Sequence, residues 1–147
     1  MLIRNQNVVF YLRSKKSATD KSPSEYVLEE VIKNKNLKDN RCFFIQATSP
    51  LLNETDIISA YKKYKKDKLD SLFTSYLTKK FIWEKINNTY VSLSYNYKKR
   101  KMRQDHKLSH VENGALYIFE TKNLLRSKNR LDKKIGTYIM PENRSLE

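Results

Sequence analysis

Glycine is scarce in this chain of 147 residues, which contains only Gly114 and Gly136. Loops that cradle phosphates use several closely spaced glycines, because the backbone must approach the ligand without a side chain in the way. The two glycines here stand in different segments. The sequence therefore excludes the P-loop and the glycine-rich dinucleotide fingerprint.

Cysteine and histidine are almost as rare. Cys42 is the one cysteine, and His106 and His110 are the two histidines. A disulfide framework needs paired cysteines and a structural zinc site needs four Cys or His ligands, so neither can be built. The histidines have no acid or nucleophile at a diagnostic spacing, and we assign them no role. Cysteine usage predicts a reducing, cytoplasmic location.

Long apolar runs are also missing. No stretch approaches the ~20 residues that a membrane span requires, and residues 1–5 lack the apolar segment of a signal peptide. We therefore expect no membrane partner.

Positive charge is what the chain has in excess. Lysine and arginine number 30 against 16 aspartates and glutamates, which gives a net charge of +14. Such a balance can mark a protein that neutralises the phosphates of a nucleic acid. It can also reflect a lysine- and asparagine-rich composition typical of an AT-rich genome. We favour composition, because lysine and asparagine are abundant throughout the chain while alanine, glycine and proline are scarce. The run Lys62–Lys68 would form the solvated outer face of a helix.

Apolar periodicity predicts alternating strands and helices. One helix would begin with Ser22 as cap, Pro23 in the first turn and Glu25 closing a capping box, and Asn53 would cap a second helix. The expected strands are Asn7–Leu12, Cys42–Gln46, Ser71–Leu77 and Ile135–Met140, with a further apolar run at Ala115–Phe119 and a short helix at Asn123–Ser127. This order predicts an α/β fold with a mostly parallel sheet and right-handed crossovers.

A β-hairpin interrupts the alternation. Phe81–Ile86 and Tyr90–Leu93 are strand-like and are separated by a turn at Asn87, a residue type that tolerates the positive φ of tight turns. Tyr95–His110, which follows, is strongly basic. Segment 78–110 is therefore predicted to form a hairpin followed by a basic segment.

The strand Cys42–Gln46 indicates a ligand site. In open α/β sheets, ligands bind just beyond the carboxyl ends of strands, which is where Gln46 and the loop after it fall. Arg103 offers bidentate geometry for a carboxylate or phosphate. Asn113, before Gly114, either forms only a turn or hydrogen-bonds a ligand that the glycine lets approach the backbone.

Five groups of residues stand in order along the chain: Arg13 with Ala18-Thr19-Asp20, then Gln46-Ala47-Thr48-Ser49-Pro50-Leu51, Arg103-Gln104, Glu112-Asn113-Gly114-Ala115-Leu116-Tyr117-Ile118 and Ile139-Met140-Pro141. Their order and spacing resemble the acylneuraminate cytidylyltransferases, the CMP-sialic acid synthetases. The resemblance covers nearly the whole chain.

The resemblance implies a CTP-dependent nucleotidyltransferase with an α/β fold, in which a Rossmann-like, mostly parallel sheet has helices on both faces. Such an enzyme transfers CMP from CTP to an acidic nine-carbon sugar of the sialic, legionaminic or pseudaminic acid type and releases pyrophosphate, assisted by Mg²⁺. It also implies a homodimer, with the hairpin as the dimerisation element and the basic segment as a lid. The residues that match functional positions are Arg13, Ser22 and Ser24 for the nucleotide, Gln46, Asn113 and Tyr117 for the sugar, Arg103 for the sugar carboxylate from a partner subunit, and Glu147 for the metal.

The chain also departs from the family pattern. Family members begin with a strand and a basic, glycine-containing loop that holds the triphosphate, and this chain starts after that loop. Ser145-Leu146-Glu147 resembles the first half of an acidic metal-binding motif. Leu52 occupies a position where the family frequently has an arginine, and Ala47 replaces a common proline. Arg130-Leu131 replaces a frequent aromatic pair. We expect residues 1–147 to form a single truncated domain with impaired activity on its own.

A different interpretation is a non-catalytic basic α/β module that binds nucleic acid or pairs with a full-length homologue. Tyr95 and Tyr97 beside lysines and arginines could serve as a stacking platform for single strands. The motifs above, however, are ordered around a nucleotide-sugar crevice, whereas the basic residues show no ordered spacing. We therefore expect CTP and an acidic sugar as partners rather than nucleic acid.

Overall fold

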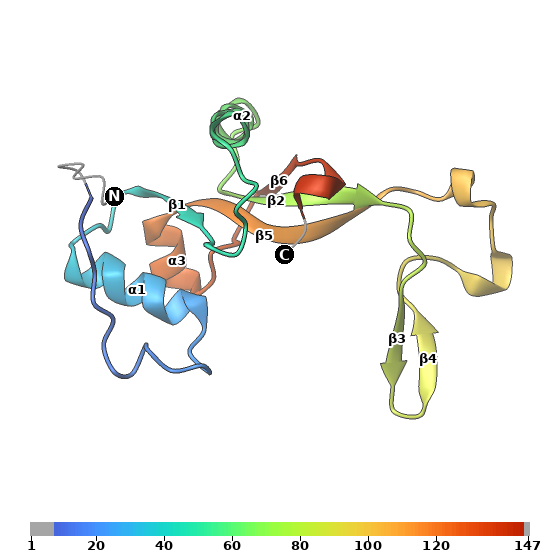
Figure 1. The fold of residues 1–147 in the computed structure, drawn as a ribbon, viewed down its shortest axis with the longest axis horizontal. Helices are drawn as coiled ribbons and strands as arrows, with labels where there is room; N and C mark the ends of the chain where they lie inside the picture. Colours follow the sequence, from blue (N-terminus) through green and yellow to red (C-terminus); the bar gives the residue numbers. More distant parts are fainter. Residues whose placement is uncertain (1–7, 146–147) are drawn as a thin grey trace.

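Strand β5 (Ser109–Glu120) lies between two neighbours in a four-stranded sheet of order β1-β5-β2-β6 (Figure 1). The computed structural model describes residues 8–145, except for the side chain of Arg103. The other strands of this sheet are β1 (Arg41–Ile45), β2 (Ser71–Thr78) and β6 (Ile135–Ile139). The sequence predicted all four to within a few residues, although β5 extends well before the apolar run.

The sheet is mixed rather than mostly parallel, which corrects the expectation from the sequence. β5 runs antiparallel to both β1 and β2, and only β2 and β6 pair in parallel. The reason lies between β2 and β5, where a projecting segment replaces a crossover helix, so the chain returns beside β2 in the opposite direction. The prediction of helices on both faces is correct.

Helix α2 (Glu54–Lys66) covers one face of the sheet. Its Ala60 and Tyr64 pack against Leu72 of β2 and against Leu116 and Ile118 of β5, and all five side chains are buried. The two β5 residues are two positions apart, as expected for side chains on one face of a strand. This is the first of two apolar cores.

Helices α1 (Ser24–Asn34) and α3 (Thr121–Ser127) cover the opposite face (Figure 1). Ile32 of α1 and Leu124 of α3 bury themselves against Tyr117 and Phe119, the β5 residues that alternate with those of the first core. Strand alternation thus divides β5 between two cores.

The two predicted helix starts had different outcomes. Asn53 caps α2 and forms a capping box, in which its side chain accepts from the backbone of Asp56 and the Asp56 carboxylate accepts from the backbone of Asn53. Ser22 does not cap α1, because the N-cap is Pro23 and no side chain caps that end. Glu25 consequently closes no capping box. It pairs with Arg130 instead.

The segment Val8–Leu12 is not a strand, and that prediction is wrong for the described residues; Asn7, its first residue, lies outside them. Phe10 and Leu12 are 87% and 95% exposed. A strand needs a neighbour to satisfy its backbone groups. Within residues 8–145, β1 pairs with no strand other than β5, and Val8–Leu12 pairs with none.

A bulge interrupts the pairing of β5 with β2. The register shifts between Phe73 and Ser75, which face Tyr117 and Glu112 respectively, so the β5 side carries extra residues. Gly114 adopts φ 68° there, a left-handed conformation that favours glycine. The hydroxyl of Thr74 fills the gap by accepting from the Leu116 N–H at 3.0 Å.

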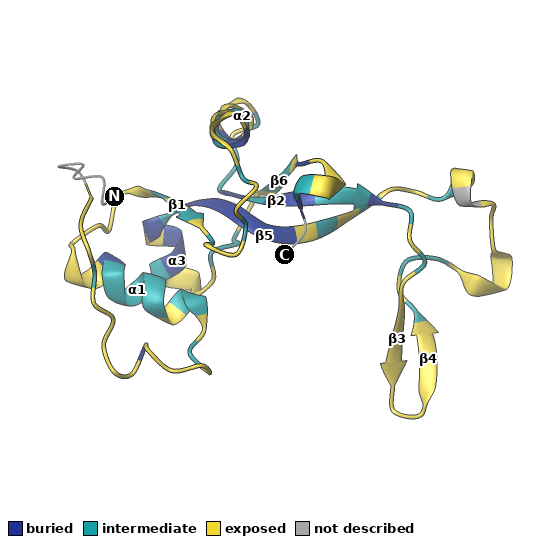
Figure 2. Cartoon of the chain, viewed as in Figure 1, coloured by how far each residue is buried: buried dark blue, intermediate teal, exposed yellow. Residues whose placement is uncertain are grey.

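Segment 79–108 projects from the sheet as an arm (Figures 1 and 2). It carries the predicted hairpin, β3 (Trp83–Ile86) and β4 (Thr89–Ser92), with Asn87 at φ 54° in the turn. Two short 3₁₀ turns follow, Tyr97–Lys99 and Arg103–Asp105. A cluster of rings holds the arm together, formed by Phe81, Trp83, Tyr95, Tyr97 and His106.

None of the helices within residues 8–145 has both the length and the apolar character needed to cross a bilayer.

Candidate functional site

The three predicted nucleotide-binding residues all line one hollow beside helix α1. Arg13, Ser22 and Ser24 surround a cavity of about 160 Å³ whose apolar wall includes Phe44. This volume is below the 300 to 1,000 Å³ of typical ligand pockets, so the hollow suits one base-sized or phosphate-sized group and not a whole nucleotide. Its combination of a guanidinium, two hydroxyls and an aromatic ring can bind an anion and stack a planar ring.

The loop that carries Arg13 is anchored by the carboxylate of Glu30 on α1. Glu30 accepts from the Ser14 hydroxyl at 2.7 Å, from the Ser14 N–H at 3.0 Å and from the Tyr11 hydroxyl at 2.8 Å. Hydrogen bonds from Ser17, Ser14 and Tyr11 lower the pKa of Glu30 from 4.5 to about 2. The loop that presents Arg13 is therefore held by an ionised carboxylate at neutral pH.

An aromatic and cationic stack continues from this hollow across the sheet. Phe44 of β1 stacks on Tyr117 of β5, with ring centroids 6.0 Å apart. The guanidinium of Arg130 lies 4.3 Å from the Tyr117 ring and 5.3 Å from the Phe44 ring, and its Nε is 3.2 Å from the Glu25 carboxylate. The stack thus joins a residue that lines the hollow to a predicted sugar-contacting residue.

Arg130 is a member of this site that the sequence analysis did not select. The sequence marked it only as a departure from an aromatic pair, and nothing in its local pattern indicated that it would cover two rings. Its Nη1 is buried and has no hydrogen-bond partner among the described residues. Contact with the Tyr117 and Phe44 rings compensates in part, since guanidinium groups stack well on aromatic faces.

Among the predicted sugar-contacting residues, Tyr117 belongs to this stack and Gln46 follows the strand that carries Phe44. The Tyr117 hydroxyl donates to the carboxylate of Glu112, which is exposed. Gln46 follows β1 directly, is half-buried, and its N–H donates to the Ala115 carbonyl at 3.3 Å. Gln46 is two positions after Phe44, so strand alternation directs both side chains toward the same face.

Asn113 is buried in the β5 bulge, with 3% of its surface exposed. Its side-chain Nδ2 donates to the Ser145 hydroxyl at 2.9 Å and contacts the Met140 sulfur at 3.4 Å, and its Oδ1 accepts from the Ala115 N–H at 3.3 Å. The amide is therefore held in one orientation by protein groups.

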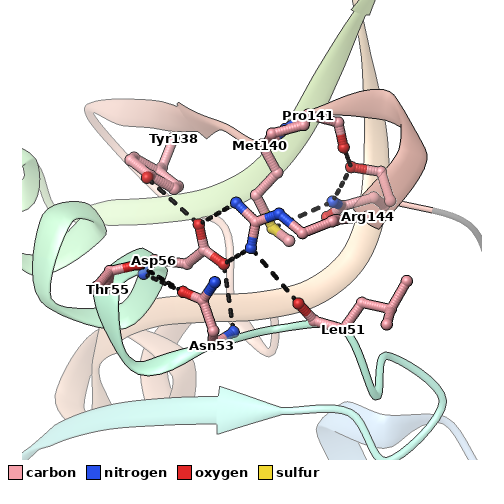
Figure 3. Close-up of polar contacts among 10 residues, drawn as sticks. Leu51, Asn53, Thr55, Asp56, Tyr138, Met140, Pro141 and Arg144 are labelled. Carbon is pink, nitrogen blue, oxygen red and sulfur yellow. Dashed lines mark hydrogen bonds and ion pairs between the residues drawn. The ribbon is translucent and has the colours of Figure 1, made fainter.

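An ion pair between Arg144 and Asp56 was not expected from the sequence (Figure 3). Both guanidinium Nη atoms of Arg144 donate to the carboxylate of Asp56, which is 1% exposed. The spacing of Asn53 and Asp56 could have indicated the capping box. No sequence signal links Asp56 to Arg144, because they are 88 residues apart.

Of the predicted site residues, the side chain of Arg103 and the whole of Glu147 lie outside what the structure describes. The backbone of Arg103 belongs to a 3₁₀ turn in the arm. Within the described residues no group of three or more His, Cys, Asp or Glu side chains could hold a metal ion. The role of Mg²⁺ stays a prediction from the resemblance.

Neither Cys42 nor the pair of His110 and Ser75 forms a nucleophilic site. Burial raises the pKa of the Cys42 thiol to about 11, so the thiol stays protonated at neutral pH. His110 Nδ1 lies 3.2 Å from the Ser75 hydroxyl, but Ser75 is completely buried and its Oγ also contacts Thr137 at 2.7 Å. The Ser75 hydroxyl is therefore engaged by two protein groups.

The sequence was also compared with known proteins. It matches none of the family models against which it was scanned, and no curated protein matches it significantly. The assignment of a function therefore depends on the residues and on their arrangement in the fold.

Proposed function

We propose that this chain is a cytidylyltransferase-like domain that binds a cytidine nucleotide and an acidic nine-carbon sugar on the α1 face of a Rossmann-like nucleotidyltransferase sheet. One observation carries the proposal. Arg13, Ser22 and Ser24, which resemble nucleotide-contacting residues, line one hollow, and its wall residue Phe44 stacks on Tyr117, which resembles a sugar-contacting residue.

In this reaction the sugar hydroxyl attacks the α-phosphate of CTP and pyrophosphate leaves. Cations and fixed donors accelerate such a transfer by stabilising charge on the phosphoryl group. In the proposal Arg13 supplies a cation, and Ser22 and Ser24 supply hydroxyl groups to the nucleotide. Gln46, Asn113 and Tyr117 orient the sugar. Bound Mg²⁺ would neutralise further phosphate charge.

The arm supports a homodimer as the working form. Trp83 and Tyr90 on the hairpin are 41% and 63% exposed, and β3 and β4 contact chiefly each other. Aromatic residues exposed together on a projecting element are typical of a protein–protein interface. Arg103 in the same arm is the residue proposed to reach the sugar carboxylate of the partner subunit.

The first test is nucleotide binding followed by nuclear magnetic resonance on the ¹⁵N-labelled chain. CMP should shift the amide signals of Arg13, Ser22 and Phe44, and GMP should shift them less. Arg13→Ala removes a charge-assisted contact and should weaken CMP binding about tenfold. Lys15→Ala, an exposed cation on the same loop, is the matched control and should leave the affinity unchanged. No response of these amides to millimolar CMP or CTP would exclude the proposed site.

The second test is catalysis. Residues 1–147 are incubated with CTP, Mg²⁺ and a sialic, legionaminic or pseudaminic acid, and pyrophosphate release is measured. Slow release that depends on the acidic sugar and falls further in Arg13→Ala is the expected result, because residues 1–147 are expected to have impaired activity on their own. Binding of CMP without any release would limit the proposal to a nucleotide-sugar binding module.

The arm gives one observation in favour of nucleic-acid binding. Segment 79–107 contains nine lysines and arginines and two acidic residues, together with the exposed rings of Trp83, Tyr90 and Tyr97. Cations interleaved with exposed aromatics suit single-stranded nucleic acid. Binding to unrelated single-stranded DNA that weakens steeply with salt, in a chain that ignores CTP, would favour this second function.

A further inference from the structure

The carboxylate of Asp56 is the centre of a polar network that joins three separate parts of the chain (Figure 3). Arg144 Nη2 is 3.0 Å from Asp56 Oδ1, and Arg144 Nη1 donates to Oδ2. The Asn53 N–H donates to Oδ2 at 3.2 Å, and the Tyr138 hydroxyl lies 3.4 Å from Oδ1. A buried carboxylate with this many donors is fully satisfied only while Arg144 stays in place.

Arg144 connects the C-terminal turn to the loop that follows β1. It ends the 3₁₀ turn Glu142–Arg144, and its Nη1 also lies 3.5 Å from the Leu51 carbonyl. Leu51 belongs to the loop that begins at Gln46. One guanidinium therefore contacts this loop and the first turn of α2 at the same time.

Ser145, the next residue, links this turn to Asn113 by a hydrogen bond. The Ser145 hydroxyl donates to the Pro141 carbonyl at 2.9 Å, which leaves its lone pairs to accept from Asn113 Nδ2 at 2.9 Å. With Nδ2 engaged there, the amide must direct Oδ1 toward the Ala115 N–H. Moving the turn would release the Asn113 amide from this orientation.

We propose that Arg144 is a positioning residue, which pairs with Asp56 to hold the C-terminal turn so that Ser145 fixes the side-chain amide of Asn113. The importance of this orientation for the sugar rests on the proposed function. A lysine cannot replace the arginine, because an ammonium group is a point charge and cannot make two parallel hydrogen bonds to one carboxylate.

The experiment compares variants by the side-chain amide signals of Asn113 in ¹⁵N spectra and by affinity for CMP-sialic acid. Arg144→Met should shift the Asn113 Nδ2 signals and weaken CMP-sialic acid binding about tenfold, the equivalent of one hydrogen bond, with affinity for CMP alone unchanged. Arg144→Lys should show most of the same effect. Arg126→Met is the matched control, because Arg126 pairs with Asp132 at an exposed position and should leave the Asn113 signals unmoved.

Ser145→Ala keeps the ion pair and removes only the link to Asn113, so it tests the proposal even if Arg144→Met does not fold. Shifted Asn113 signals in Ser145→Ala and in Arg144→Lys are the expected result. Unmoved Asn113 signals in either folded variant would overturn the positioning role. If the unmodified chain binds no CMP-sugar, the proposed function fails, while the Asn113 signals still decide whether Arg144 positions this amide.

Discussion

The sheet of this protein buries its apolar residues, whereas the hairpin of the arm leaves them exposed. In β5 the residues from Asn113 to Phe119 are all buried, whereas every residue of β3 and most of β4 are exposed (Figure 2). The sheet has helices on both faces to cover it. Among the described residues no α-helix covers the hairpin, and the rings of Tyr95 and Tyr97 pack on its Trp83. The comparison shows that strand-forming sequence alone does not produce a core.

The two regions also differ in what stabilises them. The sheet is held by two apolar cores, so its stability depends on burial. The arm depends on contacts between rings, such as Phe81 with Tyr95 at 4.4 Å and Trp83 with Tyr97 at 5.5 Å. Such pairs add only about 0.5 to 1.5 kcal/mol each beyond their burial, and we expect the arm to gain its order from a partner subunit.

The largest predicted effect is on the free energy of unfolding, which should fall much more for a truncation in the sheet than for one in the arm. Leu116→Ala in β5 removes a fully buried side chain and should lower the free energy of unfolding by about 2 to 5 kcal/mol. Ile86→Ala in the hairpin truncates a side chain that is 44% exposed and should cost much less. Urea denaturation of both variants measures the difference. Equal losses would mean that the hairpin belongs to the same cooperative unit as the sheet.

The next prediction concerns dimer formation, which we expect to depend on the arm and not on the sheet. Tyr90→Ala should weaken dimer formation by about 2 kcal/mol or more, because Tyr90 is 63% exposed on the hairpin and tyrosines are common hot spots of interfaces. The thermal unfolding of the monomer should hardly change. Sedimentation over a range of concentrations measures the dissociation constant. Tyr26→Ala, an exposed aromatic on α1, is the control, and an equal loss of dimer there would place the interface elsewhere.

A smaller effect compares two asparagine caps. Asn53→Ala removes the capping box of α2 and should destabilise the chain by about 1 kcal/mol. Asn96 accepts from the Lys98 N–H at 3.0 Å at the start of a 3₁₀ turn in the arm. Asn96→Ala should leave the unfolding midpoint unchanged. A comparable loss from both variants would contradict the separation of arm and sheet.

The smallest effect concerns the loop that carries Arg13, which is held by polar contacts rather than by a core. The pKa of Glu30 is lowered from 4.5 to about 2 by hydrogen bonds in the folded chain. A lowered pKa of an acid stabilises the fold above the unfolded value, and this stabilisation is lost as pH falls from about 4.5 toward 2. Glu30→Gln should remove this dependence. The chemical shift of the Glu30 carboxyl carbon, followed against pH, gives the midpoint, and a midpoint near 4.5 would exclude the anchor.

Much of the fold could be predicted from local sequence. Asn53 was identified as a cap because a capping residue and its helix are neighbours in the chain, and the hairpin turn at Asn87 was found for the same reason. Ser22 had an equally good local pattern, yet Pro23 took the capping position and Ser22 lines the hollow. Local propensity competes with tertiary packing and can lose to it.

The candidate site was predictable only in part. The resemblance selected Arg13, Ser22 and Ser24 individually, and the fold brings them to one hollow. Arg130 and the pair of Asp56 with Arg144 were not selected, because their partners are far away in the sequence. A long-range contact leaves no periodicity or spacing to recognise.

The sequence by itself determined most of the segments that become strands and helices, which residues alternate toward a core, and that no glycine-rich phosphate loop lies within the chain. Only the tertiary structure decided the direction of β5, the exposure of Val8–Leu12 and the network around Asp56. The physical reason is the range of the interactions. Propensities and caps act over a few residues, whereas strand pairing, burial and buried ion pairs depend on segments that meet only after the chain has folded.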